Sequence, residues 1–317
     1  MRIAIVGSGG VGGLLGAMLL RGGSEVAFLA RGAQLEAMRA GGLRVEGPVG
    51  SFAVPVPAAS DDPAQLGRAD AVLIAVKTWQ MDGLSERLRP MLAGGGFVVS
   101  LQNGVEARDR LAEVLGEQRV AGGLCHLISW IEQPGLVRQV GPVPRVTVGE
   151  WEGGGSERLV RLAAELTRAG ITAKIAPQIR AAVWDKALFV ESFGAVGAVL
   201  RLPAGAWRAQ PEPRAMLEEA MRETDEVARA AGAELGEPAI ERALSFVDAV
   251  PAESTTSMHR DLLAGKPSEL DEQTGAIVRA ADRLKIPAPL HKYLYACLLP
   301  HERAARATAT LHAWRSR

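Results

Sequence analysis

The chain has 317 residues, of which 48% are hydrophobic, and 36 Lys and Arg residues balance 36 Asp and Glu residues for a formal net charge of +0. This length predicts two domains with full hydrophobic cores, and the balanced charge argues against a nucleic-acid partner. Two distant cysteines, Cys125 and Cys297, argue against a disulfide framework or a thiolate metal site, so no metal is expected. The sequence shows no signal peptide and no apolar run of about 20 residues, which predicts a cytoplasmic protein without membrane contact.

The N-terminal stretch predicts a dinucleotide site. Residues 3–6 form an apolar, β-branched run typical of a buried parallel strand, and apolar residues from Val11 onward recur at helical spacing. Between them lies a G-x-G-x-x-G motif, in which Gly7 permits a tight turn, Gly9 lets a pyrophosphate approach, and Gly12 lets the helix pack closely. The predicted pyrophosphate-binding residues are Gly7, Ser8, Gly9, Gly10, Val11 and Gly12.

A second strand is predicted over residues 25–30, and Arg31 follows it. An acidic residue usually stands near this position in NAD-binding domains, where it binds the ribose 2′-hydroxyl. The next carboxylate in this chain is Glu36. An arginine at the strand end favours the 2′-phosphate of NADP over an ordinary solvated role.

Further strands are predicted at 71–76 and 97–101, each followed by a polar residue. Lys77 follows the first directly, and Asn103 comes soon after the second. The carboxyl ends of parallel strands form the rim where ligands bind, so both residues are candidates for the cofactor site. The alternatives are a surface lysine and a simple Asn-Gly turn.

The remaining predicted elements divide the chain near residue 178. Residues 42–57 predict two short strands, 61–69 a short helix, 156–169 an amphipathic helix, and 171–175 a last strand. Residues 120–150 predict an antiparallel extension of the sheet, with turns at 133–135 and 141–142. The pattern after residue 178 is almost wholly helical. We therefore predict an α/β fold, with a Rossmann-type domain over 1–177 and a mainly α-helical domain over 178–317.

The helical domain must supply a group that moves a proton. Lys186 lies in an otherwise apolar helix, where a lysine is costly unless it reaches a cleft. The alternative is a surface ion pair with Asp185 or another neighbour. Ser257 and Glu269 are predicted near the starts of two helices, where Glu269 could merely complement a helix N-terminus with Ser268 as its cap.

Seven segments in order carry a family resemblance: IAIVGSGGVGG, Arg31, VKTWQ, LQNGVE, WDKAL, SMHRDLLAGKPSELD and LKIPAPLHKYLYACL. With them the chain resembles the ketopantoate reductase (2-dehydropantoate 2-reductase) family, in the 6-phosphogluconate dehydrogenase-like group. The resemblance implies a Rossmann-type domain, a helical substrate domain, and reduction of ketopantoate to pantoate by NADPH for coenzyme A synthesis.

The resemblance also implies residue roles. Lys186 matches the catalytic lysine, and Glu269 matches the glutamate that orients it and the substrate. Ser257 matches a substrate-binding serine, and Asn103 matches the asparagine near the nicotinamide and the substrate. Lys77 and Arg31 match cofactor-binding positions.

The chain departs from the family pattern at two positions. The family usually has asparagines four and eight residues after the lysine, on one helical face, where this chain has Val190 and Gly194. This departure leaves open a reductase of the same fold that acts on another 2-keto acid or ketone. A third reading is a regulator that binds NADP(H) without turnover. A homodimer is a separate expectation that applies to all three readings.

Overall fold

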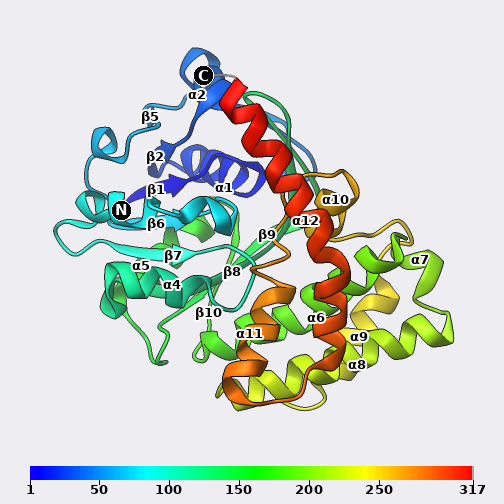
Figure 1. Ribbon diagram of the computed structural model, residues 1–317. Helices are drawn as coiled ribbons and strands as arrows, with labels where there is room; N and C mark the ends of the chain where they lie inside the picture. Colours follow the sequence, from blue (N-terminus) through cyan, green and yellow to red (C-terminus); the bar gives the residue numbers. More distant parts are fainter. Residues whose placement is uncertain (316–317) are drawn as a thin grey trace. The chain divides into compact units, whose positions relative to one another are not determined.

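The first strand of the chain, β1 (Arg2–Val6), lies inside a large sheet, between β2 and β6 (Figure 1). The computed structural model describes residues 1–315, with side chains described through residue 309. The chain forms two compact units: the first unit comprises residues 1–102 and 107–179, and the second unit comprises residues 103–106 and the chain from Arg180 onward.

The sheet of the first unit has ten strands in the order β4-β3-β9-β8-β7-β6-β1-β2-β5, with β10 paired to β9. β1 pairs in parallel with β2 on one side and with β6 on the other, so the strand order reverses there. Such a reversal is the usual ligand-binding position in open α/β sheets. The other strands are β2 (Glu25–Leu29), β3 (Leu43–Glu46), β4 (Phe52–Val54), β5 (Ala59–Ser60), β6 (Ala71–Ile74), β7 (Phe97–Ser100), β8 (Val120–Gln133), β9 (Leu136–Gly149) and β10 (Thr172–Ile175).

Apolar residues on both faces of the sheet explain the helices that cover it. Two clusters of buried residues lie in this unit, and β1 contributes Ile3 and Ile5 to one and Ala4 and Val6 to the other. The helices are α1 (Gly10–Arg21), α2 (Gly32–Gly41), α3 (Leu84–Arg87), α4 (Ala107–Leu115) and α5 (Glu157–Arg168), with short 3-10 turns η1 (Pro63–Leu66), η2 (Thr78–Met81), η3 (Arg89–Leu92) and η4 (Glu117–Arg119). The helix predicted over 61–69 is reduced to the turn η1.

The predicted antiparallel extension is the hairpin of β8 and β9. Its turn at 133–135 is confirmed, with Gly135 at φ +80°. The second predicted turn, at 141–142, is wrong because these residues lie inside β9. The register shifts there: Ile128 pairs with Val140, whereas His126 pairs with Arg145. The extra residues bulge out of the ladder without ending it, and Gly141 at φ +75° permits the bend.

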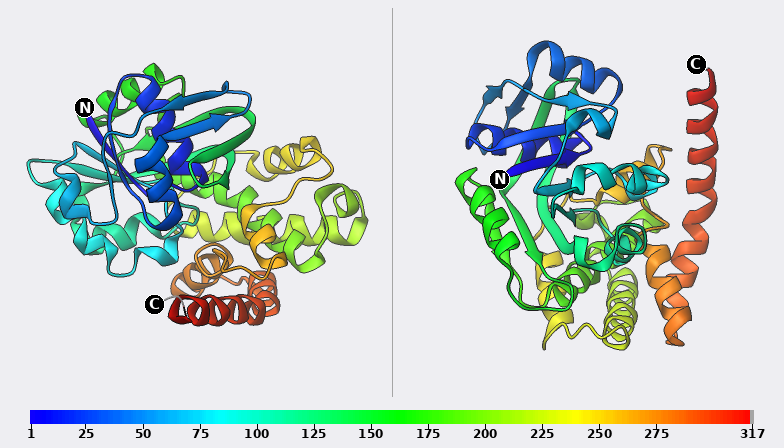
Figure 2. Two further views of the ribbon diagram at one scale, coloured as in Figure 1. Left: turned by 90° about the horizontal axis from the view of Figure 1, so that it is seen from above. Right: turned by 90° about the vertical axis from the view of Figure 1, so that its left-hand side faces the viewer.

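The second unit is helical. Its helices are α6 (Ile179–Leu200), α7 (Ala204–Trp207), α8 (Pro211–Ala230), α9 (Ala239–Ala249), α10 (Ser257–Leu263), α11 (Thr274–Leu284) and α12 (Pro289–Arg315). α12 continues through Pro300 (Figure 2). The core of the second unit surrounds the fully buried Trp207. Over the described part of the chain, each helix is too short or too polar to span a bilayer.

Candidate active site

The glycine loop joins β1 to α1, and its glycines have different surroundings. Gly7 has φ +96°, and a Cβ on Gly12 would lie 1.9 Å from the Gly7 carbonyl oxygen. A Cβ on Gly9 would meet no atom within 4 Å. α1 begins without a side-chain cap or an acidic residue in its first turn. The loop therefore offers an open face and uncapped N–H groups, which suit a pyrophosphate.

The glycine loop is held by contacts with distant parts of the chain, which the sequence does not reveal. The Gln34 side-chain amide nitrogen donates to the Ser8 carbonyl at 3.1 Å, and its oxygen accepts from the Gly135 N–H at 2.9 Å. A Cβ on Gly10 would lie 2.3 Å from the Ser129 carbonyl oxygen, so β8 passes close to the loop. These contacts join residues far apart in the chain, and a local sequence pattern carries no signal for them.

Arg31 stands at the edge of the same loop. It precedes the first residue of α2, in extended backbone at φ −147°. Two residues earlier, the Leu29 carbonyl accepts the Gly7 N–H at 2.9 Å. The Arg31 side chain is exposed and makes no ion pair or hydrogen bond within the described residues. Its charge is therefore available to an anionic group of a bound cofactor.

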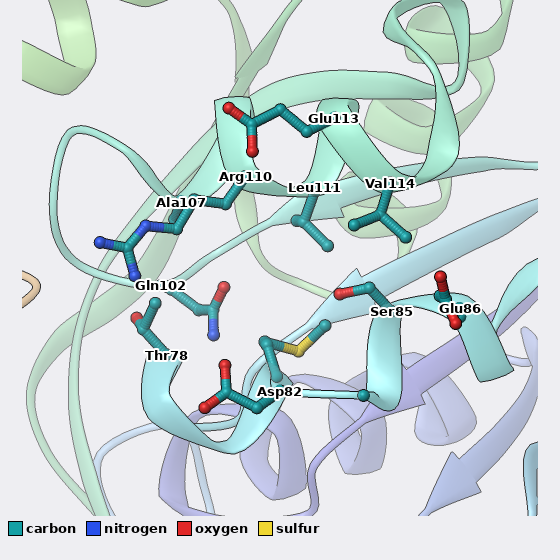
Figure 3. Close-up of a pocket in the computed structure, with 12 residues that line it drawn as sticks. Thr78, Asp82, Ser85, Glu86, Gln102, Ala107, Arg110, Leu111, Glu113 and Val114 are labelled. Carbon is teal, nitrogen blue, oxygen red and sulfur yellow. The ribbon is translucent and has the colours of Figure 1, made fainter.

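Lys77 follows β6 and precedes the turn η2, where its backbone N–H donates to the Gln80 side chain at 3.1 Å. The neighbouring strand end is tied to it by Gln102, whose amide nitrogen donates to the Val76 carbonyl at 2.9 Å. A cavity of about 360 Å³ opens here between η2 and α4, with Gln102 and Arg110 on its wall (Figure 3). None of the predicted site residues lines this cavity.

In the second unit the structure brings Lys186 and Asn103 together. The Lys186 ammonium donates to the Asn103 side-chain oxygen at 2.7 Å. The ion-pair alternative fails, because Asp185 is 51% exposed and pairs with Arg242 at 3.1 Å. Lys186 is half-buried and lies between the buried Trp184 and Leu188 along α6. The ammonium on this apolar helix thus donates a hydrogen bond to a neutral amide.

The segment 103–106 is fixed to the second unit. Gly104 has φ +95°, and a Cβ there would lie 2.2 Å from the Glu272 carbonyl oxygen. Val105 packs in the core with Trp184, and Glu106 accepts from Arg279 at 2.8 Å. The Asn-Gly sequence is therefore a bend in the chain, and this bend also sets the position of the Asn103 amide.

Ser257 begins α10, and Glu269 lies in the connection between α10 and α11. Glu269 is buried at 4% exposure, in the turn before α11. The Ser268 hydroxyl accepts from the Leu270 N–H at 3.1 Å and donates to Glu302 at 2.5 Å, so it caps a turn and not the helix α11, which begins only at Thr274. Ser257 is the first residue of α10, as predicted.

The face of α6 beyond Lys186 has little room at Gly194. A Cβ there would lie 2.8 Å from the Thr256 hydroxyl oxygen and 3.4 Å from the Met258 terminal methyl carbon. Thr256 is itself fixed, because its hydroxyl accepts from the His259 N–H at 3.2 Å. Val190, between Lys186 and Gly194, is half-buried. Position 194 therefore cannot hold an amide side chain unless Thr256 moves.

Two buried carboxyl groups near this site have raised pKa values. Burial raises the pKa of Glu191 to about 8, although the Lys186 charge opposes this shift. Burial also raises the pKa of Glu272 to about 7, against the Arg306 charge. The sequence places Glu191 off the Lys186 face of the helix and does not reveal its burial. Residues 1–309 hold no group of three or more His, Cys, Asp or Glu side chains arranged for a metal ion.

Comparisons with known proteins match the chain in two blocks. The profile described as "Ketopantoate reductase PanE/ApbA" matches residues 3–153, and its C-terminal counterpart matches residues 178–302. A 2-dehydropantoate 2-reductase from Halobacterium salinarum is 30% identical, over 93% of this chain and 96% of its own length.

Solved structures agree. The PanE/ApbA family ketopantoate reductase from Ralstonia eutropha has a TM-score of 0.88 at 33% identity, covering 96% of this chain and 100% of its own. The 2-dehydropantoate 2-reductase from Geobacter metallireducens has a TM-score of 0.88 at 30% identity, covering 95% and 99%.

Proposed function

The chain belongs to the ketopantoate reductase PanE/ApbA family, and from this premise we propose that it reduces 2-dehydropantoate to pantoate with NADPH, for coenzyme A synthesis. The observation that carries the proposal is the hydrogen bond from Lys186 to Asn103. This bond holds a proton donor in place on an apolar helix, and the partner is a neutral amide and not a carboxylate. Dimerisation stays a prediction.

The first unit supports the choice of cofactor. The open face at Gly9 and the uncapped start of α1 fit the pyrophosphate, and the exposed Arg31 fits a 2′-phosphate. Lys77 is a further cofactor-binding candidate at the adjacent strand end. When bound, NADPH supplies the hydride that the substrate ketone carbon accepts.

The second unit supplies the proton. The Lys186 ammonium donates a hydrogen bond to the ketone oxygen and stabilises the negative charge that develops there. As the alcohol forms, one Lys186 N–H bond breaks and the product O–H bond forms, and the neutral amine then recovers a proton from solvent. Asn103 orients the ammonium, and we assign Glu269 and Ser257 to orienting and binding the substrate.

The test is NADPH oxidation followed by absorbance with 2-dehydropantoate, with NADH as the control cofactor. Saturable turnover with NADPH is expected. Tight NADPH binding without turnover of any ketone would instead favour a regulator, and no NADPH binding would refute the cofactor assignment.

A second candidate function follows from Gly194. With Thr256 filling the space beside it and Val190 apolar, this face of α6 lacks the two amides of the family pattern. Each missing hydrogen bond to a substrate hydroxyl costs about 1 kcal/mol or more. The same architecture would then reduce a 2-keto acid or ketone without that hydroxyl. A panel of 2-keto acids decides between the two, since the true substrate has the largest kcat/KM.

A further inference from the structure

The turn 268–273, between α10 and α11, holds a proposed site residue in a buried position. Ser268 and Glu269 are 0% and 4% exposed. Within the turn, the Gln273 N–H donates to the Glu269 carbonyl at 2.9 Å. A buried N–H group outside regular structure needs an acceptor, and the acceptor for Ser268 comes from another element.

The first residue of this turn is held by α12. The buried Glu302 carboxylate accepts the Ser268 N–H at 3.0 Å and the Ser268 hydroxyl at 2.5 Å. One helical turn later, Arg306 donates to the Glu302 carboxylate at 2.5 Å and to the Ser268 carbonyl at 3.2 Å. Arg306 also lies 3.6 Å from the Glu272 carboxylate. Two charged residues of α12 therefore fix the N–H, the hydroxyl and the carbonyl of the residue before Glu269.

The other end of the turn lies against the segment 103–106. A Cβ on Gly104 would lie 2.2 Å from the Glu272 carbonyl oxygen, so the two backbones are in direct contact. Arg279 on α11 joins the same two segments, because it donates to the Asp271 carbonyl and to a carboxylate of segment 103–106, both at 2.8 Å. The turn is thus fixed to α12 on one side and to this segment on the other.

We propose that Glu302 and Arg306 are positioning residues for the proton-donating site. From α12 they fix the turn 268–273, and the turn supports the bend where Asn103 accepts from Lys186. The proposal rests on the role that the proposed function gives to this pair. Because a displacement of about 1 Å at a reacting group can cost about 10²-fold in rate, residues that touch neither substrate nor cofactor can control kcat in this way.

The first test is Glu302→Ala, which removes the acceptor of the turn. With whichever 2-keto acid is reduced, kcat should fall by about 10-fold or more, since the proton donor is no longer held in place. The Kd for NADPH should change little, because the residues proposed to bind its phosphates lie in the first unit. Glu302→Gln keeps the shape and one acceptor oxygen, so its kcat should be intermediate, and it replaces Glu302→Ala in both tests if that variant does not fold.

Glu223→Gln is the matched control. Glu223 on α8 is also a buried carboxylate that accepts backbone N–H groups of α12, those of Leu290 and His291 at 2.7 and 2.8 Å. These bonds join α8 to α12 and do not involve the turn 268–273. The loss of Glu223 should therefore lower stability and leave the kcat of the folded protein unchanged. An equal fall of kcat in Glu223→Gln, or an unchanged kcat in the Glu302 variants, would overturn the proposal.

The second test needs no turnover, so it separates failure of this proposal from failure of the proposed function. Asn103 is the only asparagine in the chain, so ¹⁵N labelling of asparagine side chains gives one NH₂ group in a proton–nitrogen NMR spectrum. Lys186→Met marks the position of this signal without the hydrogen bond. In Glu302→Ala the signal should move towards that position, and in Glu223→Gln it should stay at the wild-type position. An unmoved signal in Glu302→Ala would refute the positioning role.

Discussion

Two adjacent residues on α6 have different electrostatic surroundings. Asp185 is exposed and pairs with Arg242, whereas the ammonium of Lys186 donates to the Asn103 amide. An amide accepts a hydrogen bond without adding a full charge, and in the proposed mechanism Asn103 orients the ammonium in this way. The chemistry proposed for this chain depends on that difference between neighbours.

Replacing Lys186 tests the proton donor. Lys186→Ala is expected to lower kcat by about 10²-fold or more, because the developing alkoxide loses its acid, while the Kd for NADPH stays unchanged. Steady-state kinetics and a fluorescence titration of NADPH measure the two effects. Asp185→Asn is the matched control on the same helix and should keep kcat. An unchanged kcat in Lys186→Ala would remove this residue from the mechanism.

Replacing Arg31 tests the preference for NADPH. Arg31→Ala should raise the Kd for NADPH by about 10- to 100-fold, the loss of one charge-assisted contact of roughly 1.5–3 kcal/mol, and change the Kd for NADH much less. Arg39→Ala is the control, since Arg39 is exposed on α2, the helix that follows Arg31, and donates to the Ala59 carbonyl. Equal losses for both cofactors would contradict a 2′-phosphate contact.

At the scale of elements, the β1–α1 junction separates a glycine needed for folding from one needed for binding. Gly12→Ala should lower the free energy of unfolding by about 1–3 kcal/mol, because its Cβ would overlap the Gly7 carbonyl. Gly9→Ala should change it by less than about 0.5 kcal/mol, since its Cβ meets open space, yet weaken NADPH binding.

Urea unfolding and NADPH titration of both variants check this prediction. If Gly9→Ala bound NADPH as tightly as the wild type, the open face of the loop would not be where the pyrophosphate lies.

Local patterns predict most elements of the sheet and fail where long-range packing decides. The β1–α1 junction and the β8–β9 hairpin follow from periodicity and turn residues, and the family and fold class are confirmed. The pair Gly141-Pro142 has the composition of a turn but forms a bulge, because the partner strand continues beside it. The two-residue strand β5 is too short to give a pattern.

The candidate site shows the same division. Lys186 can be predicted as a site residue because it is a charged residue in an apolar helix, and Asn103 because it is a polar residue at the end of a strand. Their mutual hydrogen bond depends on the segment 103–106 joining the second unit, which chain order does not indicate. The burial of Glu191 depends on which helices pack on α6, and helical periodicity alone gives no sign of it.

At the scale of the whole molecule, a buried polar cluster joins three helices of the second unit. The Glu223 carboxylate on α8 accepts the N–H groups of Leu290 and His291 at the start of α12, at 2.7 and 2.8 Å. The His291 ring nitrogen Nδ1 lies 2.7 Å from the same carboxylate, and Nε2 lies 3.3 Å from the Thr224 hydroxyl. Ser192 on α6 contacts Thr224 and completes the cluster.

This cluster predicts how stability depends on pH. Burial alone would raise the pKa of Glu223, but the hydrogen bonds from His291 and Leu290 outweigh burial and lower it. A lowered pKa gives stability that is present above the unfolded value, near 4.3, and is lost as pH falls through the folded value.

Glu223→Gln should therefore lower the free energy of unfolding at pH 7, and the difference from the wild type should shrink below about pH 4. Urea unfolding followed by helical circular dichroism at several pH values measures this. Glu218→Gln is the control on the same helix, where Glu218 is partly exposed and pairs with Arg214. A difference that does not vary with pH would contradict the ionic role of Glu223.

Residues 103–106 pack in the second unit, so they cannot reach their final contacts until the later part of the chain has been synthesised. These four residues leave the ribosome before the helices they pack on, since α6 begins only at Ile179 and α11 at Thr274. Until those helices follow, Val105 has no core to enter and Asn103 has no lysine to bind. The nascent chain can thus form its glycine loop early, while the proton-donating site is assembled only near the end of translation.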